Sequence, residues 1–142
     1  MAKVFLSVSD QCENAYAYGN TNEAEICRKI ADVCEIALKR CGFEVKNSKT
    51  NSYVERTMES NVWGSQAHIT IHTNAASVPV SGTRIFTYGN SVNETKLAQC
   101  MYDTLIPFVS GTSDGLSEYP DLAEQRQREL KVKGFDSFIE IK

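Results

Sequence analysis

Long hydrophobic runs and an excess of basic residues are both missing from this chain. No window approaches ~18 consecutive apolar residues, which argues against a membrane-spanning helix, and the apolar run at residues 4–6 is too short for the core of a signal peptide. The 15 basic residues are outnumbered by 18 acidic ones, giving a net charge of −3, and no stripe of Lys and Arg interleaves with aromatics. We therefore expect neither a membrane nor a nucleic acid as partner, and a protein that is cytoplasmic as synthesised.

Glycine is absent from residues 9–15, and the cysteine count of five is odd. The first absence excludes the glycine-rich loop that cradles phosphate groups after a strand. An odd count without a signal peptide favours reduced thiols. Cys27, Cys34 and Cys41 recur every seven residues, so they share one helix face with ~10 Å between neighbours, too far to bridge or to share a metal. We expect them to pack as small apolar side chains in the core.

Apolar periodicity divides the chain into alternating strand-like and helix-like segments. Strands are expected at residues 3–8, 43–46, 67–74, 83–88 and 135–141, and helices at residues 21–41, 52–64 and 91–107. Asn or Ser followed three residues later by Glu indicates capping boxes at Asn20, Ser52 and Ser91. Gly42 and Gly64 supply left-handed helix ends. Residues 110–121 are typical of a loop, and residues 122–133 are compatible with either a helix or an extended edge.

This alternation predicts an α/β fold. We expect a single domain over residues 1–142, with a mixed, mostly parallel, twisted sheet and helices on both faces. The short link between the third and fourth strands predicts one antiparallel pair between them. On the second helix, Val54, Met58 and Val62 fall on one side. No helix is expected after the last strand, so the sheet should lack a covering C-terminal helix.

Both histidines of the chain lie in residues 67–74, which read Ala-His-Ile-Thr-Ile-His-Thr-Asn. In a strand the side chains of His68 and His72 point to the same face but stand ~13 Å apart, so they cannot both bind one ion. Ligands of open α/β sheets bind beyond the carboxyl ends of the strands. His72 is therefore the candidate for chemistry, with a hydrogen-bonding cap as its alternative, and His68 is expected to be solvated or structural.

Three carboxylates are expected at the same rim of the sheet as His72. Asp10 follows the first strand, Glu23 lies in the first turn of the first helix, and Glu140 lies near the end of the last strand. One imidazole with two or three carboxylates matches a divalent metal site, with zinc favoured by the histidine. The alternatives are a turn former for Asp10, a helix cap for Glu23, and a solvent-facing edge residue for Glu140. A carboxyl group between apolar neighbours, as at position 140, also suits a general acid or base.

Six short motifs run in order along nearly the whole chain. They are Lys-Val-Phe-Leu-Ser in the first strand, Asn22-Glu23 at the first helix, Cys-Gly-Phe-Glu-Val after it, Ile-His-Thr-Asn-Ala at residues 71–75, Ser-Gly-Thr-Arg at residues 81–84, and Ile-Glu-Ile at residues 139–141. Together they resemble the zinc-dependent N-acetylmuramoyl-L-alanine amidases of the type-3 family. The resemblance implies a peptidoglycan hydrolase that cleaves the amide bond between N-acetylmuramic acid and L-alanine, at the cell wall once the protein is released or exported.

The same resemblance assigns roles to individual residues. It implies one zinc ion with Glu23 and His72 among its ligands, and Glu140 as the catalytic acid/base. The family's first ligand is the histidine of a Gly-His pair, but the matching residues here are Ser9 and Asp10. We therefore expect Asp10 as the third ligand, in a site that is harder and binds zinc less tightly. A second hypothesis is a catalytically weakened or inactive relative that binds peptidoglycan or a protein partner through the same cleft.

Overall fold

A computed structural model describes residues 1–16, 19–73, 83–87, 92–108, 115–118 and 135–141, the last two ranges by their backbone alone. The elements are β1 (Lys3–Val8), α1 (Glu23–Arg40), β2 (Glu44–Asn47), α2 (Tyr53–Trp63), β3 (Ala67–Thr73), β4 (Thr83–Thr87), α3 (Val92–Leu105), a short 3-10 helix η1 (Ile106–Phe108), β5 (Gly115–Glu118) and β6 (Phe135–Ile141). None of the helices within these ranges is long and apolar enough to cross a membrane.

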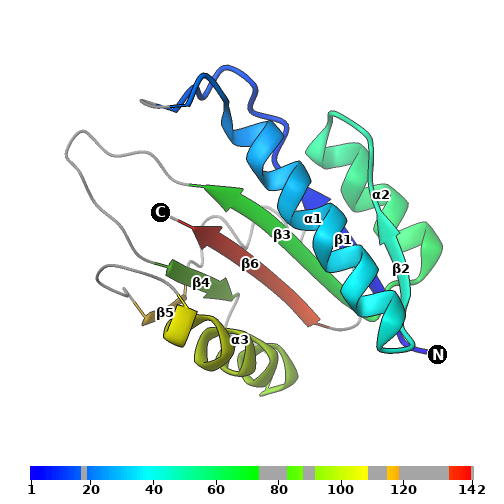
Figure 1. Cartoon of the computed structure of the whole chain (residues 1–142). Coiled ribbons are helices and arrows are strands. Elements are labelled where there is room, and N and C mark those ends of the chain that lie inside the picture. The colour runs from blue at the N-terminus through cyan, green and yellow to red at the C-terminus, as the bar shows by residue number, and fades with distance from the viewer. Residues whose placement is uncertain (17–18, 74–82, 88–91, 109–114, 119–134, 142) are drawn as a thin grey trace.

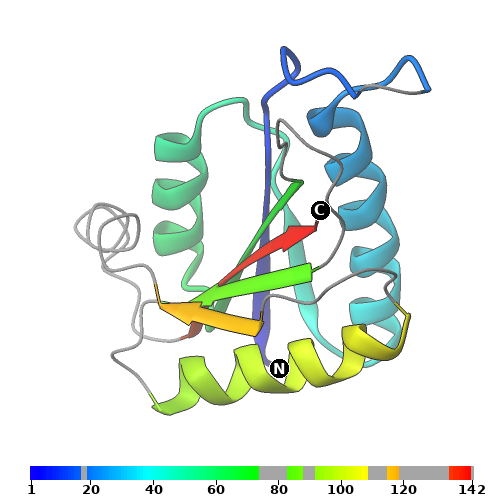
Figure 2. The same ribbon diagram turned by 90° about the vertical axis from the view of Figure 1, so that its left-hand side faces the viewer.

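The six described strands form one twisted sheet in the order β2-β1-β3-β6-β4-β5 (Figure 1). Its neighbours pair in parallel except β4 and β6, which are antiparallel. Helices α1 and α2 lie on opposite faces of the β1 side of the sheet, and α3 packs against β4 and β6 (Figure 2). The predicted mixed, mostly parallel α/β sheet with helices on both faces is confirmed.

The partner of the antiparallel strand differs from the prediction. We expected β3 and β4 to pair, but β6 lies between them. Residues 74–82 separate β3 from β4 in the chain, which is more than a tight hairpin turn needs, so the short link does not force the two strands together. The central position therefore goes to β6, which pairs with β3 over seven registered positions from Ala67 to Thr73.

The apolar core lies between α1 and the sheet. Val4, Leu6 and Val8 of β1 and Ile71 of β3 pack against Cys27 and Ala31 of α1, with Cys34 partly buried at its margin. Cys27 and Cys34 thus confirm the core prediction, whereas Cys41 is exposed because it follows the last helical residue. All five cysteines are free thiols.

Helix ends follow the predicted chemistry with one correction. Ser52 caps α2 by accepting from the Glu55 backbone N–H, and Gly42 and Gly64 adopt the expected left-handed conformation at φ +88° and +70°. The cap of α1 is Asn22, not Asn20, because Asn22 Oδ1 accepts from the Glu25 N–H at 3.0 Å. Asn20 instead takes a left-handed turn conformation at φ 49°.

Two predictions concern the later part of the chain. The loop prediction for residues 110–121 is wrong at Gly115–Glu118, which form β5 at the sheet edge beside β4. A short Gly-Leu-Ser-Glu segment carries little strand propensity, and pairing with a neighbour decides its conformation. The expected cap Ser91 and residues 122–133 lie outside the described residues.

Helix α2 turns its polar side towards the sheet. Met58 and Val62, on the apolar side, are 60% and 89% exposed, whereas Arg56, Thr57 and Ser60 are buried. The sheet face beneath them is also largely polar, because odd-numbered residues of β1 and even-numbered residues of β3 supply Ser7, His68 and Thr70. The exception is Phe5, a buried residue of β1 whose ring stacks on His68 and lies 6.5 Å from the Trp63 ring of α2. Polar side chains therefore predominate between α2 and the sheet, in contrast to the apolar layer under α1.

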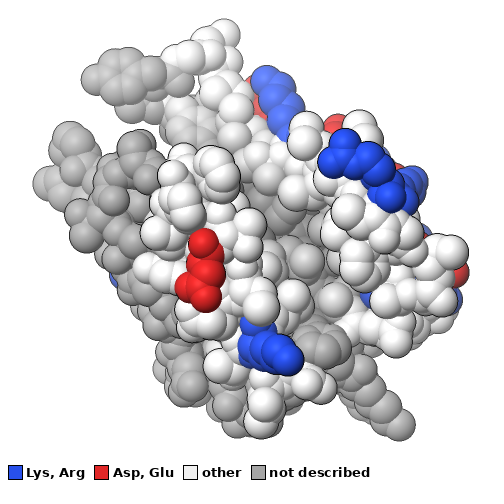
Figure 3. All heavy atoms as spheres, turned by 60° about the horizontal axis from the view of Figure 1, so that its bottom comes forward, with Lys and Arg blue, Asp and Glu red and all other residues white. Residues whose placement is uncertain are grey.

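Charged side chains on the outer surface are dispersed. On the face shown in Figure 3, Lys and Arg atoms of the described ranges lie at several places, those in the upper right with Asp or Glu atoms beside them. This distribution accords with the net charge of −3.

Candidate active site

Glu23 and His72 meet at the carboxyl rim of the sheet. Glu23 is the first residue of α1, and His72 is the last but one of β3. Their side chains are in direct contact, with His72 Nδ1 2.9 Å from Glu23 Oε1. The Glu23 side chain is only 5% exposed. The predicted convergence of a carboxylate and an imidazole from distant segments is therefore present.

A polar loop after β1 holds the second oxygen of Glu23. Asn14 Nδ2 donates to Glu23 Oε2 at 2.8 Å and also to Oε1 of Gln11. The Glu23 backbone N–H donates to the Asn14 carbonyl at 2.9 Å. Such partners offset the cost of burying a carboxylate. Sequence reasoning missed Asn14, although the long, pattern-free loop in which it lies is itself a signal of function.

The floor beside this pair is closed by Tyr16, Cys27 and Thr73. The Tyr16 hydroxyl donates to Thr73 Oγ1. Burial raises the pKa of the Cys27 thiol to about 12, and the nearby charge of Glu23 adds to the rise. Cys27 is therefore a neutral thiol at neutral pH in the metal-free protein.

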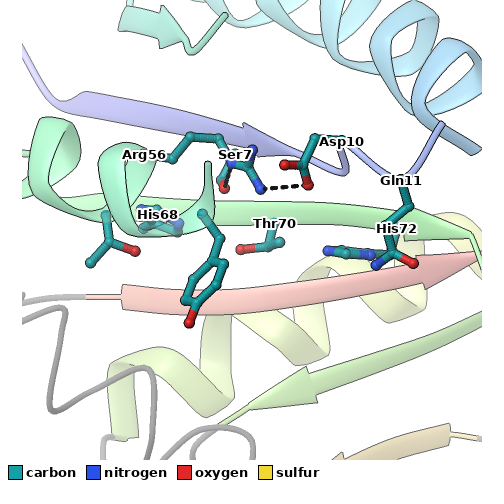
Figure 4. A pocket seen from close by; sticks show the side chains of 9 residues that line it. Ser7, Asp10, Gln11, Arg56, His68, Thr70 and His72 are labelled. Atoms are coloured by element: carbon teal, nitrogen blue, oxygen red, sulfur yellow. Dashed lines mark hydrogen bonds and ion pairs between the residues drawn. The ribbon is translucent and has the colours of Figure 1, made fainter. Parts of the chain in front are cut away.

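Asp10 lies near the rim but contacts a different partner. Its Oδ1 is 3.5 Å from Nη2 of Arg56, a residue of α2 that is 2% exposed. The same guanidinium donates from Nε to Ser7 Oγ at 3.0 Å and from Nη1 to the Thr50 carbonyl at 3.1 Å. Figure 4 shows the Asp10 carboxylate directed towards Arg56. The third expected ligand is thus engaged by a buried cation that sequence reasoning did not identify.

A pocket of about 100 Å³ on the α2 side of the sheet is lined by Asp10, Arg56 and His72 but not by Glu23. Its lining comprises Ser7, Asp10, Gln11, Tyr53, Arg56, Thr57, His68, Thr70 and His72. His68 and His72 both line it, as expected for residues four apart in one strand. His68 is buried, its Nδ1 is 2.9 Å from Ser60 Oγ, and its ring stacks on Phe5, so the structural alternative predicted for it is correct.

Glu140 is placed at this rim by the strand register. In β6 its Cα is paired with that of His72 in β3 on one side and with that of Arg84 in β4 on the other. The side chain of Glu140 lies outside the described residues. Its backbone position is nevertheless next to the histidine, as predicted for a residue near the end of the last strand.

The donor chemistry of the site fits zinc. A carboxylate oxygen of Glu23 and an imidazole nitrogen of His72 are in contact, and a second carboxylate, that of Asp10, lines the same pocket as His72. Within the described residues, however, no three acidic, histidine or cysteine side chains already converge on one point. The structure therefore brings two candidate ligands into contact, and the third candidate, Asp10, contacts Arg56 instead.

Comparison with known proteins gives one family and several similar folds. The family model described as N-acetylmuramoyl-L-alanine amidase matches residues 9–131. No curated protein matches the chain significantly.

Three solved structures illustrate the fold similarity. The CwlD amidase from Clostridioides difficile, solved in complex with the GerS lipoprotein, has a TM-score of 0.79 at 16% identity over 99% of this chain and 82% of that one. The amidase AmiC2 of Nostoc punctiforme has a TM-score of 0.76 at 15% identity over 97% and 77%. The catalytic domain of the CD27L endolysin, which targets Clostridia Difficile, has a TM-score of 0.70 at 20% identity over 98% and 80%. At these identities the likeness establishes a shared fold.

Proposed function

The chain belongs to the N-acetylmuramoyl-L-alanine amidase family, and on this premise we propose that the rim of β1, β3 and β6 is the site at which it hydrolyses peptidoglycan. The bond cleaved is the amide between N-acetylmuramic acid and the L-alanine of the stem peptide. The observation that carries the proposal is the contact between the buried Glu23 and the partly buried His72, two groups 49 residues apart in the chain that meet at 2.9 Å. For a substrate of this kind we propose that the protein acts at the cell wall, which it reaches by release or export.

The family is zinc-dependent, and we propose one zinc ion held by Glu23, His72 and Asp10. Glu23 and His72 support this assignment by their contact, and Asp10 by its place in the lining of the same pocket. When bound, zinc supplies a Lewis acid that polarises the scissile carbonyl and lowers the pKa of a water molecule. The Asn14 amide holds Glu23 in place, and Glu23 holds His72, so the donors are oriented in advance.

Glu140 is proposed as the general acid/base, supported by its register opposite His72. It takes a proton from the attacking water, whose oxygen bonds to the lactyl carbonyl carbon. The carbon–nitrogen bond then breaks, and Glu140 delivers the proton to the departing nitrogen of L-alanine. The products are a free lactyl carboxylate and a free stem peptide.

Release of stem peptides from purified cell walls tests this proposal. General acid/base catalysis contributes typically 10²–10⁴-fold, so we expect Glu140→Gln to reduce release by roughly 100-fold or more. Glu55→Gln is the matched control, because Glu55 is an exposed residue of α2. Circular dichroism should show both variants folded. Wild-type rates from a folded Glu140→Gln protein would contradict the assignment.

A second candidate function is supported by the Asp10–Arg56 contact. If that contact keeps the third ligand from the metal, the chain acts as a weakened or inactive relative that binds peptidoglycan, or a protein partner, in the same cleft. The solved CwlD structure contains a lipoprotein partner, which supports testing protein ligands as well. Stoichiometric zinc by elemental analysis favours the enzyme, whereas a metal-free protein that still retains muropeptides favours the binder.

A further inference from the structure

Arg56 is held unequally by its three partners. Its guanidinium lies 3.0 Å from Ser7 Oγ and 3.1 Å from the Thr50 carbonyl, but 3.5 Å from Asp10 Oδ1. Arg56 is 2% exposed, whereas the Asp10 side chain is 31% exposed. The guanidinium is thus fixed by β1 and by the segment before α2, and the carboxylate of Asp10 is the most distant of its three partners.

Asp10 is also the only carboxylate among the described residues that line the pocket shared with His72. The Glu23–His72 pair has two donors in contact and needs a third to form the three-ligand set of a catalytic zinc site. The neighbouring side chain of Gln11 is engaged by Asn14. The carboxylate of Asp10 is therefore the candidate partner of two cations, the buried guanidinium of Arg56 and the metal ion.

We propose that Arg56 and the catalytic cation compete for the carboxylate of Asp10, so that Arg56 sets the metal affinity of the site. Arg56 is then a positioning residue that acts through Asp10. The inference rests on the proposed function and adds to it that competition from Arg56 weakens metal binding, so that the metal exchanges readily. A purely structural Arg56 would fill the polar layer under α2 without affecting metal affinity through Asp10.

A double-mutant cycle on zinc affinity separates these roles. The zinc dissociation constant is measured by competition with a chromophoric chelator for the wild type, Arg56→Gln, Asp10→Asn and the double variant. We expect Arg56→Gln to tighten zinc binding about tenfold and Asp10→Asn to weaken it about tenfold, within the 10–100-fold range typical of groups that support metal ligands. In the Asp10→Asn background the gain from Arg56→Gln should vanish.

Asp32→Asn is the matched control, because it removes the same charge from a carboxylate 3.1 Å from Lys49 on the exposed side of α1. It should leave zinc affinity unchanged. An equal gain from Arg56→Gln with and without Asp10 would mean that Arg56 merely repels the cation, and would overturn the competition. The competition also fails if Asp10→Asn binds zinc as tightly as the wild type.

A second variant keeps the test decisive if Arg56→Gln does not fold. Asp10→His retains a donor at position 10 but removes the anion that Arg56 binds, so zinc affinity should rise at least about tenfold. Unchanged affinity in this variant would contradict the competition. Zinc binding of equal strength in all proteins would refute the competition alone, whereas no zinc binding and no stem-peptide release by the wild type would refute the proposed function itself.

Discussion

Replacing Glu23 by Gln tests the centre of the site. The substitution keeps the shape of the side chain but removes its charge from the 2.9 Å contact with His72 and the 2.8 Å contact with Asn14. Hydrogen bonds to charged groups are worth about 1.5–3 kcal/mol, against about 1 kcal/mol for neutral ones. The Gln variant loses the extra strength of the charged hydrogen bonds, but this loss is offset because a neutral amide costs less to bury than a carboxylate. We therefore expect the free energy of unfolding to change by no more than about 1 kcal/mol.

Metal affinity should respond far more strongly than stability. Gln is a poor ligand for zinc, and the loss of an anionic ligand should weaken binding by roughly 100-fold, which corresponds to about 2.7 kcal/mol. Chelator competition measures the zinc affinity, and stem-peptide release from purified walls measures the activity. Both should fall together, while chemical denaturation shows a protein of near wild-type stability.

Glu25→Gln is a control within the same helical turn. Glu25 also lies in the first turn of α1, so both substitutions remove one favourable charge from the helix N-terminus, worth about 0.3–1 kcal/mol each. Glu25 binds the Thr21 hydroxyl rather than His72. Equal zinc affinity in the two variants would refute the assignment of Glu23 as a ligand.

Four further predictions concern stability. Asn22→Ala removes the cap of α1 and should lower the free energy of unfolding by about 1 kcal/mol, measured by urea denaturation. Val62→Lys on the exposed side of α2 should change it by less than about 0.5 kcal/mol. Ser60→Ala, which removes the hydroxyl beside His68, should cost about 1–3 kcal/mol in the same assay. The raised pKa of Cys27 means that the unfolded chain ionises first, so stability should fall as pH rises above the ordinary value of 9.0 towards about 12, by up to about 1.4 kcal/mol per pH unit.

Each of these has an opposite outcome that would count against it. Loss of stability in Val62→Lys as large as in Ser60→Ala would mean that α2 buries its apolar side. An alkaline slope of the same size in Cys27→Ala would assign the pH dependence to other groups. An Asn22→Ala protein as stable as the wild type would mean that another residue caps α1.

The convergence of Glu23 and His72 could be predicted because it depends on topology alone. Parallel strands end at one rim, and the helices that follow them begin there, so the positions of β1, α1 and β3 along the chain fix where these two side chains lie. The same logic placed Asp10 and the backbone of Glu140 at the rim. None of these placements required knowledge of individual contacts.

The partner of Asp10 could not be predicted in this way. Arg56 comes from α2, 46 residues further along the chain, and the apolar periodicity of that helix indicates a different buried side. Val54, Met58 and Val62 form a stripe with helical spacing, but the sheet face below offers mainly serine, threonine and histidine besides Phe5. Which side of a helix is buried depends on the complementary surface, and a helix sequence alone does not contain that surface.

The position of β6 was misjudged for a related reason. Pairing between neighbouring segments is the local expectation, whereas β6 reaches its place between β3 and β4 through contacts that span more than sixty residues, such as His72 with Glu140. Long-range pairings of this kind leave no local periodicity in a sequence.

The central place of β6 also bears on the order in which the sheet can form. Residues 135–141 leave the ribosome after every other described strand, yet they join the β1–β3 half of the sheet to the β4–β5 half. Until they emerge, β3 has no strand on the side that β6 occupies, and the two halves of the sheet are not joined. Closure of the sheet is therefore a non-local step that comes late in folding, and pairings of this kind are slow to form.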